Sequence, residues 1–556
     1  MSSLFTSTTQ PFVEPVSEFA WLVILGGFIC FAMAWGIGAN DVANCFGTSV
    51  GSRAITIKQA VVIASIFEFA GAMALGASVT STIRKKITDY DYFEGEADVL
   101  MLGMFCSLCA ASLWLYLATK YQLPVSTTQS IIGAIIGFVI VSKGPQAVVW
   151  EQVIYIAIFW VASPVLAAIG SLILFLPSRQ YLFRREDSYE KTLLTWPFWV
   201  FLVVFIMTLF LLMKGLKRLD LEYTLGTATW ISIICGVAAA ILAWLVFIKS
   251  GIVQKHCEKV VAKRREQKEK KTDAEMADME NGGTAGDKDK ETESERTDAV
   301  KSDADDAKDD ELVAASPKSE ASSSRFALLA RKAAASASYG VTVDVTREED
   351  MNDLERAIHQ NSEVFDELTE EAFAWLQVCT ASLDIFAHGS NDVANAVAPF
   401  AAMVALYGEA SIVSNAPVPW WILFIGAAGM TIGLATYGYK VIATLGVKMV
   451  KMSSTRGYCI ELASALTVIL ASHYGFPTST THAQVGATVG VGLCEKLRPD
   501  SKLKWSTVIN WKLLGGVFIG WVATLLIAGI TSALLFSILA YSPYAGDASY
   551  IDRSYP

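Results

Sequence analysis

The sequence "GIGANDVANCF" at residues 36–46 ends the first long apolar stretch of the chain, and "HGSNDVANAVAPF" at residues 388–400 follows another. Both contain the five letters NDVAN, which place an aspartate and two asparagines beside a stretch of membrane-spanning length. An ionised aspartate inside a bilayer is costly, so it needs partners within the protein. The repeated motif therefore predicts two copies of one half-molecule that meet around one polar site.

Composition favours a membrane protein. The 556 residues are 53% hydrophobic and 18% charged, whereas an ordinary soluble domain has about a quarter of its residues charged. Apolar stretches of transmembrane length lie near 19–37, 57–79, 98–119, 124–142, 150–176, 195–213, 227–248, 372–389, 419–447, 456–473, 477–494 and 509–540. They predict an all-α polytopic membrane protein with about 12 transmembrane segments, because barrel strands would alternate over about 10 residues. The leader lacks the basic start of a secretory signal, so we expect the first stretch to be retained.

The charge is concentrated in the middle of the chain. Acidic residues between 251 and 370, as in "KDKETESERTDAVKSDADDAKDDE" at 288–311, account for the net charge of −10. This part has too few large apolar residues to offset its ordering entropy, so we expect a largely disordered loop. The basic cluster "KHCEKVVAKRR" at 255–265 predicts that the loop is cytoplasmic. We therefore expect a first membrane repeat with extra helices at 1–250 and a second membrane repeat at 371–556.

A second pair of matching stretches strengthens the internal repeat. "YQLPVSTTQSIIGAIIG" from Tyr121 and "YGFPTSTTHAQVGATVG" from Tyr474 align at a constant offset of 353 residues, and the NDVAN copies are offset by 351. Two motifs that recur in the same order predict one ancestral unit used twice. The two units are inverted if an odd number of crossings separates them. Seven segments precede the loop if the PVSTT segment crosses the membrane, and six if it is re-entrant.

The NDVAN residues have the chemistry of a cation site. The six polar side chains are Asn40, Asp41, Asn44, Asn391, Asp392 and Asn395. Consecutive residues do not share a helix face, so an unbroken helix would point some of these groups at lipid. A helix broken here would combine freed carbonyls with side-chain oxygens, a cage suited to a small hard cation. Simple helix capping by Asn and Asp is the structural alternative.

The hydroxyl-rich turns "PVSTT" and "PTSTT" have the opposite character. Each places Pro and Ser/Thr at the expected start of a helix, where these residues are favoured. A half-helix that begins at membrane depth offers unpaired N–H groups and the positive end of its dipole, which suits a tetrahedral oxyanion. The candidate anion-binding residues are Ser126, Thr127, Thr128, Gln129, Ser479, Thr480, Thr481 and His482. Neither turn contains an arginine, so bound cations would balance the charge; an interfacial cap without a ligand is the alternative.

Two glutamates lie within apolar stretches, Glu68 in "ASIFEFAGA" and Glu461 in "YCIELASA". The offset of 353 places Leu108 opposite Glu461, so the repeat does not duplicate these groups. Intramembrane carboxylates usually mark an ion pathway, and we expect cation ligands or proton carriers. A structural hydrogen bond to a neighbouring helix is the alternative.

Together, the NDVAN pair, Glu68, "PVSTT", "IELASALTV" and "PTSTTHAQVG" resemble the inorganic phosphate transporter (PiT) family over both membrane halves. This family comprises sodium-coupled phosphate symporters of animals and fungi and proton-coupled bacterial and plant relatives. The resemblance implies alternating access with two inverted repeats, cation and phosphate ligands at the NDVAN residues and hydroxyl turns, and essential glutamates at Glu68 and Glu461. Gln129 stands where many relatives have His, and Gln484 where a Lys is common, which mildly favours sodium over proton coupling.

The resulting expectation is a sodium-coupled importer of inorganic phosphate in the plasma membrane, with sodium as co-substrate and no cofactor. We expect neither enzymatic activity nor a nucleic-acid partner, and a homodimer is one option for the assembly. Proton-coupled phosphate symport and a sulfate or arsenate carrier are alternatives within the same class. A phosphate-binding receptor or sensor is an alternative of another class. An intramembrane enzyme with Ser126 or Ser479 as nucleophile is the weakest reading, because no base with an orienting partner is visible.

Overall fold

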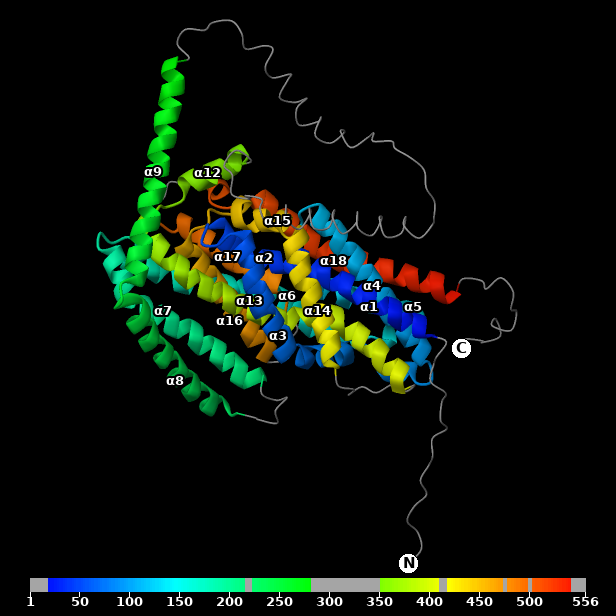
Figure 1. Cartoon of the computed structure of the whole chain (residues 1–556). Coiled ribbons are helices and arrows are strands. Elements are labelled where there is room, and N and C mark those ends of the chain that lie inside the picture. Colours follow the sequence, from blue (N-terminus) through cyan, green and yellow to red (C-terminus); the bar gives the residue numbers. More distant parts are fainter. Residues whose placement is uncertain are drawn as a thin grey trace, which may run out of the picture. The chain divides into compact units, whose positions relative to one another are not determined.

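The computed structural model describes residues 19–215, 223–281, 351–409, 418–473, 478–498 and 503–541 (Figure 1). Within these ranges the chain is helical, and the one β-type pairing is an isolated bridge between Thr88 and Val148. By its internal contacts the chain divides into two units. One comprises Met1–Ile252 with Ser336–Pro556, and the other comprises Val253–Ala335.

The helices follow one another in this order. The first part contains α1 (Ala20–Ile37), α2 (Ala43–Gly51), α3 (Ile57–Lys86), α4 (Ala97–Lys120), α5 (Thr127–Lys143), α6 (Trp150–Ser178), α7 (Ser188–Phe210), α8 (Leu225–Ala243) and α9 (Ile252–Asn281). The second part contains α12 (Asp353–Asn361), α13 (Glu367–Glu409), α14 (Trp420–Tyr437), α15 (Tyr439–Ala443), α16 (Ser454–His473), α17 (Thr480–Lys496) and α18 (Trp511–Tyr541). Short π-helical turns are η2 (Gly38–Val42), η5 (Arg179–Phe183), η6 (Leu211–Gly215), η8 (Trp244–Ile248) and η11 (Thr444–Lys448); short 3-10 turns are η3 (Tyr90–Phe93), η4 (Pro145–Ala147) and η12 (Trp505–Thr507).

The helices confirm the prediction of an all-α membrane protein. Every apolar stretch that the sequence predicts falls on a helix. In the described part, eight helices are long and apolar enough to cross a membrane, and α5 is apolar but only 17 residues long. The count of 12 crossings remains a prediction.

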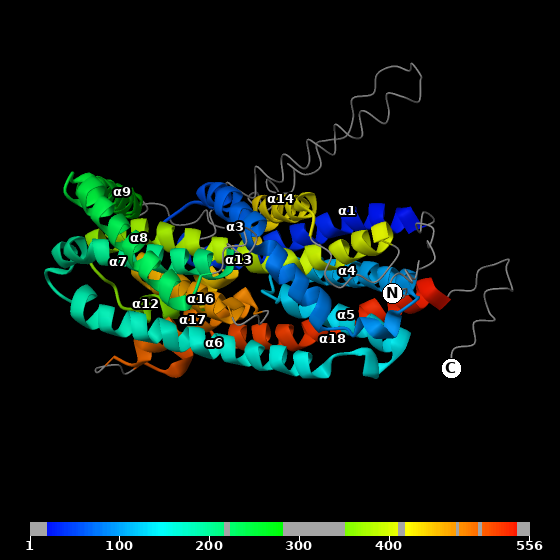
Figure 2. The same ribbon diagram turned by 90° about the horizontal axis from the view of Figure 1, so that it is seen from below.

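Two helical hairpins, α4 with α5 and α16 with α17, carry the hydroxyl-rich turns. The helices α5 and α17 each have 17 residues and begin 353 residues apart, so the internal repeat is visible in their boundaries. α5 packs against α4, and α17 packs against α16. The two helices lie on opposite sides of the middle of the bundle (Figures 1 and 2). Their N-terminal ends meet there, because Thr127 of α5 and Thr481 of α17 both bond to Asp41.

Each hairpin packs closely against one long helix at a glycine that recurs in both repeats. Gly133 of α5 lies against the backbone of Leu525 in α18, and Gly486 of α17 lies against the backbone of Pro164 in α6. A Cβ atom at either glycine would collide with that backbone. Gly133 and Gly486 therefore allow close helix packing, which holds α5 against α18 and α17 against α6.

Ion pairs close the open ends of both hairpins. Lys143 at the end of α5 lies 2.6 Å from Glu96, which precedes α4. Arg456 at the start of α16 lies 2.5 Å from Glu495 at the end of α17, and both side chains are buried. Arg456 also donates to the Glu363 carbonyl, which lies in the segment between α12 and α13. This end of the second hairpin is thereby tied to the segment that leads into α13.

The long helix α13 runs through the centre of the bundle (Figures 1 and 2). It has 43 residues, and at 1.5 Å per residue it spans about 64 Å. It packs along α3 and α16 and also contacts α1, α4 and α7. Polar residues on its central turns are thus removed from lipid by helices on several sides.

The predicted break in the helix at NDVAN is wrong for both copies. The second copy lies inside the uninterrupted helix α13. In the first copy, Asn40 and Asp41 lie in the π-helical turn η2 and Asn44 lies in α2, and η2 joins α1 to α2 without leaving the helical conformation. In an unbroken helix, some of the polar side chains were expected to face lipid. They do not, because the two hairpin ends cover them and supply hydrogen-bond partners.

Both ends of the predicted central loop are helical. In the second unit, α9 is strongly charged and carries an i,i+4 ion pair between Glu266 and Lys270. In the first unit, α12 starts with a capping box formed by Asn352 and Glu355. The expected disorder of 251–370 therefore does not extend to these ends, while 282–350 lies outside the described residues.

Candidate functional site

Asp41 in η2 contacts both hairpins. Its Oδ2 accepts hydrogen bonds from the Thr127 hydroxyl at 2.6 Å and the Thr127 backbone N–H at 3.3 Å. Its Oδ1 accepts a hydrogen bond from the Thr481 hydroxyl at 2.6 Å. One buried carboxylate of the first repeat therefore joins the N-terminal ends of α5 and α17.

Asp392 repeats one of these bonds in the second half. Its Oδ2 accepts a hydrogen bond from the Thr480 hydroxyl at 2.6 Å, and Thr480 is the repeat equivalent of Thr127. Its Oδ1 accepts hydrogen bonds from the side-chain amides of Asn391 at 3.0 Å and Asn395 at 3.1 Å. The bond between the motif aspartate and the first threonine of the turn is thus the same in both halves.

The first asparagine of each motif holds the neighbouring turn. Asn40 donates to the Leu123 carbonyl at 2.9 Å and accepts a hydrogen bond from the Val125 N–H at 3.0 Å. Asn391 donates to the Thr478 carbonyl at 2.9 Å, and Thr478 is the repeat equivalent of Val125. Both asparagines therefore position the polar turn that precedes α5 or α17.

The last asparagine of each motif reaches across to the other half. Asn44 donates to the Thr481 hydroxyl at 3.2 Å, and Asn395 donates to the Thr128 hydroxyl at 3.1 Å. In each amide the Oδ1 atom is buried and has no hydrogen-bond partner. Buried amide oxygens are normally satisfied, so these two oxygens beside the aspartates are available as ligands for a cation.

The serines of the hydroxyl turns cap their own helices. The Ser126 hydroxyl accepts a hydrogen bond from the Gln129 N–H at 3.2 Å, and the Ser479 hydroxyl accepts one from the His482 N–H at 3.3 Å. The His482 ring stacks on Trp521 at 3.8 Å between ring centroids, and its Nδ1 lies 2.9 Å from the Trp160 carbonyl oxygen. His482 is therefore engaged with α18 and α6, whereas the threonine hydroxyls point to the NDVAN residues.

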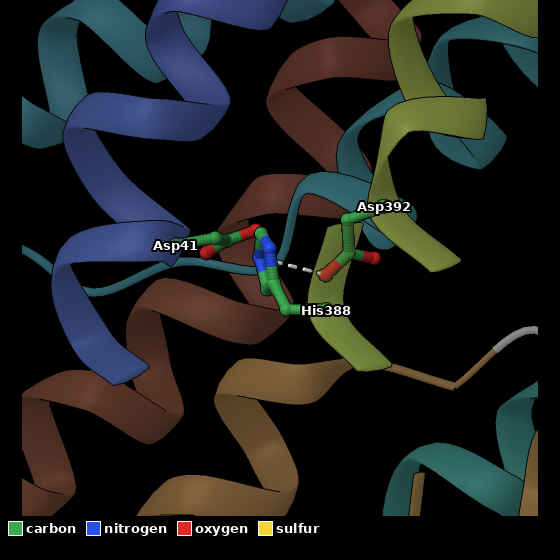
Figure 3. Close-up of side chains that lie close together, drawn as sticks. All are labelled: Asp41, His388 and Asp392. Carbon is green, nitrogen blue, oxygen red and sulfur yellow. Dashed lines mark ion pairs between the residues drawn. The ribbon is translucent and has the colours of Figure 1, made fainter. Parts of the chain in front are cut away.

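Glu68 reaches the same centre through a histidine. Its Oε1 lies 2.8 Å from His388 Nδ1. The other ring nitrogen, His388 Nε2, lies 3.0 Å from Asp392 Oδ2 (Figure 3). One ligand atom from each of Asp41, His388 and Asp392 lies within 4.8 Å of the others. An imidazole whose two nitrogens both face carboxylates can donate to both only as the imidazolium. His388 thus lies between the carboxylates of Glu68 and Asp392.

Glu461 forms a separate cluster. Its carboxylate accepts hydrogen bonds from Thr48 at 2.6 Å, Thr380 at 2.6 Å, Gln377 at 3.1 Å and the Ser49 hydroxyl. All four partners donate, which suits an ionised carboxylate. The structure thus divides the sequence-predicted residues between a centre around Asp41 and Asp392 and this second cluster.

Two buried residues in the same region were missed from the sequence. His388 lies one turn before Asp392, and Asp384 lies one turn before His388, both inside an apolar stretch. The internal repeat gave no sign of them, because the equivalent residues at the 351-residue offset are apolar, Ile37 and Met33. A search for any ionisable residue spaced by four from the motif aspartate would have found both.

The centre combines two kinds of binding chemistry. The aspartates and the unpaired amide oxygens offer hard oxygen ligands, which suit a cation such as sodium. The N-terminal ends of α5 and α17, with their threonine hydroxyls, offer hydrogen-bond donors and the positive ends of two helix dipoles, which suit an oxyanion. The side chains of the centre are almost fully inaccessible to solvent: Asp41 is 2% exposed and Asp392 1% exposed. The centre is therefore shielded from solvent in this structure.

Comparisons with known proteins agree with this chemistry. Residues 37–532 match the phosphate transporter family. The phosphate-repressible phosphate permease pho-4 of Neurospora crassa is 32% identical, over 95% of this chain and 99% of its own length. The sodium-dependent phosphate transporter 1-A of Danio rerio is 29% identical, over 95% of this chain and 96% of its own length.

A solved structure, described as the sodium-dependent phosphate transporter, has the same fold. It aligns with a TM-score of 0.65 and 26% sequence identity over 94% of this chain and 100% of its own length. The family match covers both membrane halves, including both NDVAN motifs and both hydroxyl turns. The chain belongs to the phosphate transporter family.

Proposed function

We propose that this chain is a sodium-coupled importer of inorganic phosphate that works by alternating access. The observation that carries the proposal is the pair of unpaired amide oxygens on Asn44 and Asn395. Each lies in an NDVAN motif, beside an aspartate and at a point where helix N-termini converge. The site thus offers cation ligands and anion ligands in one buried place.

The hydrogen bonds suggest how sodium and phosphate are coupled. In this structure the hydroxyls of Thr127 and Thr481 donate to Asp41, and the hydroxyl of Thr480 donates to Asp392. A sodium ion at an aspartate would neutralise the carboxylate and accept the lone pairs of a hydroxyl, which has only one hydrogen to donate. The hydroxyl hydrogens would then turn to phosphate oxygens, so sodium binding prepares the phosphate site.

Alternating access would require these contacts to separate on one side at a time. Asn44 bonds to the hairpin of the second half, and Asn395 bonds to the hairpin of the first half. Because the two bonds are related by the internal repeat, loosening either one would open the centre beside a different hairpin. Inverted repeats in transporters commonly provide two such equivalent gates.

The names of relatives support sodium as the co-substrate. The Danio rerio and Plasmodium falciparum proteins are both described as sodium-dependent phosphate transporters. We further propose a plasma-membrane location. The basic cluster at 255–265 supports a cytoplasmic position of the acidic loop.

Proton coupling is the second candidate, and one observation favours it. His388 lies between Glu68 and Asp392, and its two nitrogens are 2.8 Å and 3.0 Å from their carboxylate oxygens. Such a chain of ionisable groups is able to carry a proton across part of the membrane.

The experiment that separates these candidates is uptake of radioactive phosphate into proteoliposomes that contain the purified full-length protein. Sodium is replaced by choline at two external pH values. Sodium coupling predicts that uptake collapses in choline at both pH values. Uptake that persists in choline and follows the proton gradient would support proton coupling, and bound phosphate that is never transported would support a receptor.

A further inference from the structure

The central loop begins with helix α9, directly after a membrane-spanning segment. The last turn of the span Leu225–Ile248 contains Trp244, which is 46% exposed, and the Lys249 Nζ atom lies 5.7 Å from the centre of its ring. Exposed tryptophans are enriched where membrane meets water, and lysines there reach toward the headgroups. Because α9 starts at Ile252, three residues after Lys249, chain connectivity alone keeps its first turns near the lipid headgroups.

One side of these first turns is basic and exposed. Lys255, Lys259 and Lys263 follow at intervals of four residues, so they form a row along the helix with a rise of about 6 Å between neighbours. All three are exposed, and none of them has an ion-pair partner in the described part of the chain. Ile252, an apolar residue that is 43% exposed, begins the same side. We call these four residues the lysine face.

The rest of the first three turns differs from the lysine face. Val253, Cys257 and Val261 also follow at intervals of four residues, but on the opposite side of the helix. The three lysines are the only Lys or Arg residues between 252 and 263. The basic charge is therefore confined to one side, as expected of a helix that faces a flat anionic surface.

The charges of α9 are also arranged against its helix dipole. Residues 255–271 contain eight Lys or Arg and three Glu, a net charge of +5, whereas residues 272–281 contain four acidic residues and no basic one. Acidic groups stabilise a helix at its N-terminal end and basic groups at its C-terminal end, and α9 has the reverse order. A negative surface beside the N-terminal half offsets this unfavourable order, so it stabilises the helix.

We propose that the lysine face of α9 binds the anionic phospholipid headgroups of the leaflet in which the span Leu225–Ile248 ends. Cytoplasmic leaflets carry such lipids, and each basic residue near them strengthens binding about fivefold, or on the order of 100-fold for three residues. The contact holds the start of the central loop on the membrane, while the same surface repels the acidic residues from 272 onward. The proposal does not depend on which ions the protein transports.

The test is hydrogen–deuterium exchange of the full-length protein in nanodiscs, made of phosphatidylcholine alone or of phosphatidylcholine mixed with phosphatidylserine. Binding of the lysine face stabilises the helix, so we expect the amides of residues 255–270 to exchange at least about tenfold more slowly with phosphatidylserine. High salt removes this slowing, because the screening length falls to about 3 Å at 1 M. Equal exchange in the two kinds of nanodisc would overturn the proposal.

A triple variant removes the charge of the lysine face, with Lys255→Gln, Lys259→Gln and Lys263→Gln together. We expect the slowing by phosphatidylserine to disappear in this variant, and its persistence would overturn the proposal. Lys259→Gln alone, which removes the middle charge, is the second variant in case the triple variant inserts poorly. We expect it to reduce the slowing about fivefold, and an unchanged slowing would overturn the proposal.

The matched control removes three charges from other sides of the same helix, with Arg264→Gln, Arg265→Gln and Lys268→Gln together. Because the lysine face is intact in this control, we expect phosphatidylserine to slow exchange by at least about fivefold. Equal losses of the slowing in the two triple variants would overturn the proposal, since total charge rather than the lysine face would then explain the effect.

Two measurements in phosphatidylcholine nanodiscs separate a lipid surface from other anions. Inorganic phosphate that slows the exchange of residues 255–270 as much as phosphatidylserine does would show that the lysine face binds free anions. Deletion of the acidic segment 288–311 that speeds this exchange would show that the lysine face is already occupied by that segment. Either result would overturn the proposal, and we expect neither treatment to change the exchange of α9.

Discussion

Replacing Thr481 by Val tests the bond that joins the two halves of the protein. Thr481 is buried, donates to Asp41 at 2.6 Å and accepts from Asn44 at 3.2 Å. Valine has nearly the same shape but no hydroxyl. A hydrogen bond to a charged group contributes about 1.5–3 kcal/mol. If the Thr481 hydroxyl oxygen is a sodium ligand of comparable strength, its loss raises the half-saturating sodium concentration for phosphate uptake about 10- to 150-fold.

The repeat-equivalent position provides a graded comparison. Thr128 accepts a bond from Asn395 at 3.1 Å, and no bond from its hydroxyl to Asp392 is seen among the described contacts. Loss of one neutral hydrogen bond costs about 0.5–1.5 kcal/mol, so we expect Thr128→Val to raise the half-saturating sodium concentration only about 2- to 10-fold. The internal repeat is thus predicted to be asymmetric in energy.

Thr488→Val is the matched control for these measurements. Thr488 is buried on the same helix as Thr481, but its hydroxyl donates to the backbone of that helix, at the Gln484 carbonyl. Uptake is measured in proteoliposomes over a range of sodium concentrations, with the amount of inserted protein equalised. A half-saturating sodium concentration for Thr481→Val within twofold of that for Thr488→Val would refute the reasoning.

Three further changes test other parts of the account. Asp41→Asn removes the charge and keeps the shape, so we expect loss of phosphate uptake with normal surface expression; normal uptake would rule out the cation site. Ser126→Ala with Ser479→Ala removes two helix caps worth about 1 kcal/mol each, and we expect weaker apparent phosphate affinity in competition assays, whereas unchanged affinity would reduce both serines to dispensable caps. Glu495→Gln leaves Arg456 buried without its ion-pair partner, which typically costs about 3–5 kcal/mol; a thermal midpoint in detergent equal to that of the parent would contradict this.

Much of the fold follows from the sequence because lipid imposes simple rules. Stretches of about 20 apolar residues can satisfy their backbone only as helices, so the predicted segments all fall on helices. The repeat of PVSTT and PTSTT also predicts the hairpin ends, since Ser126 and Ser479 cap α5 and α17 in the same way. Local chemistry was enough for these features.

The hydrogen-bond partners of the site residues could not be predicted from local sequence. The bond from Asn44 to Thr481 joins residues 437 positions apart, and only the packing of α2 against α17 brings them together. The expected helix break at NDVAN failed for the same reason. The hairpin ends that cover Asp41 and Asp392 cannot be predicted from the motif itself, so a broken helix whose freed carbonyls share a cation with the aspartates was expected instead.

His388 and Asp384 were not predicted from the sequence, because the internal repeat identifies only residues that occur in both halves. His388 and Asp384 have apolar equivalents in the first half. Glu461, whose equivalent is Leu108, was predicted because it interrupts an apolar stretch. Yet a transporter must distinguish its two sides, and residues that break the symmetry can provide that difference. In such proteins the unpaired ionisable residues merit as much attention as the repeated motif.

The most direct test of the central claim is reciprocal binding of phosphate and sodium to the purified protein. If both ions occupy one site formed by the two NDVAN motifs and the two hydroxyl turns, sodium strengthens phosphate binding and phosphate strengthens sodium binding by the same factor. We predict that factor to be at least about tenfold in the parent and close to one in Asp41→Asn. Phosphate binding that is the same in sodium and in choline would contradict the account.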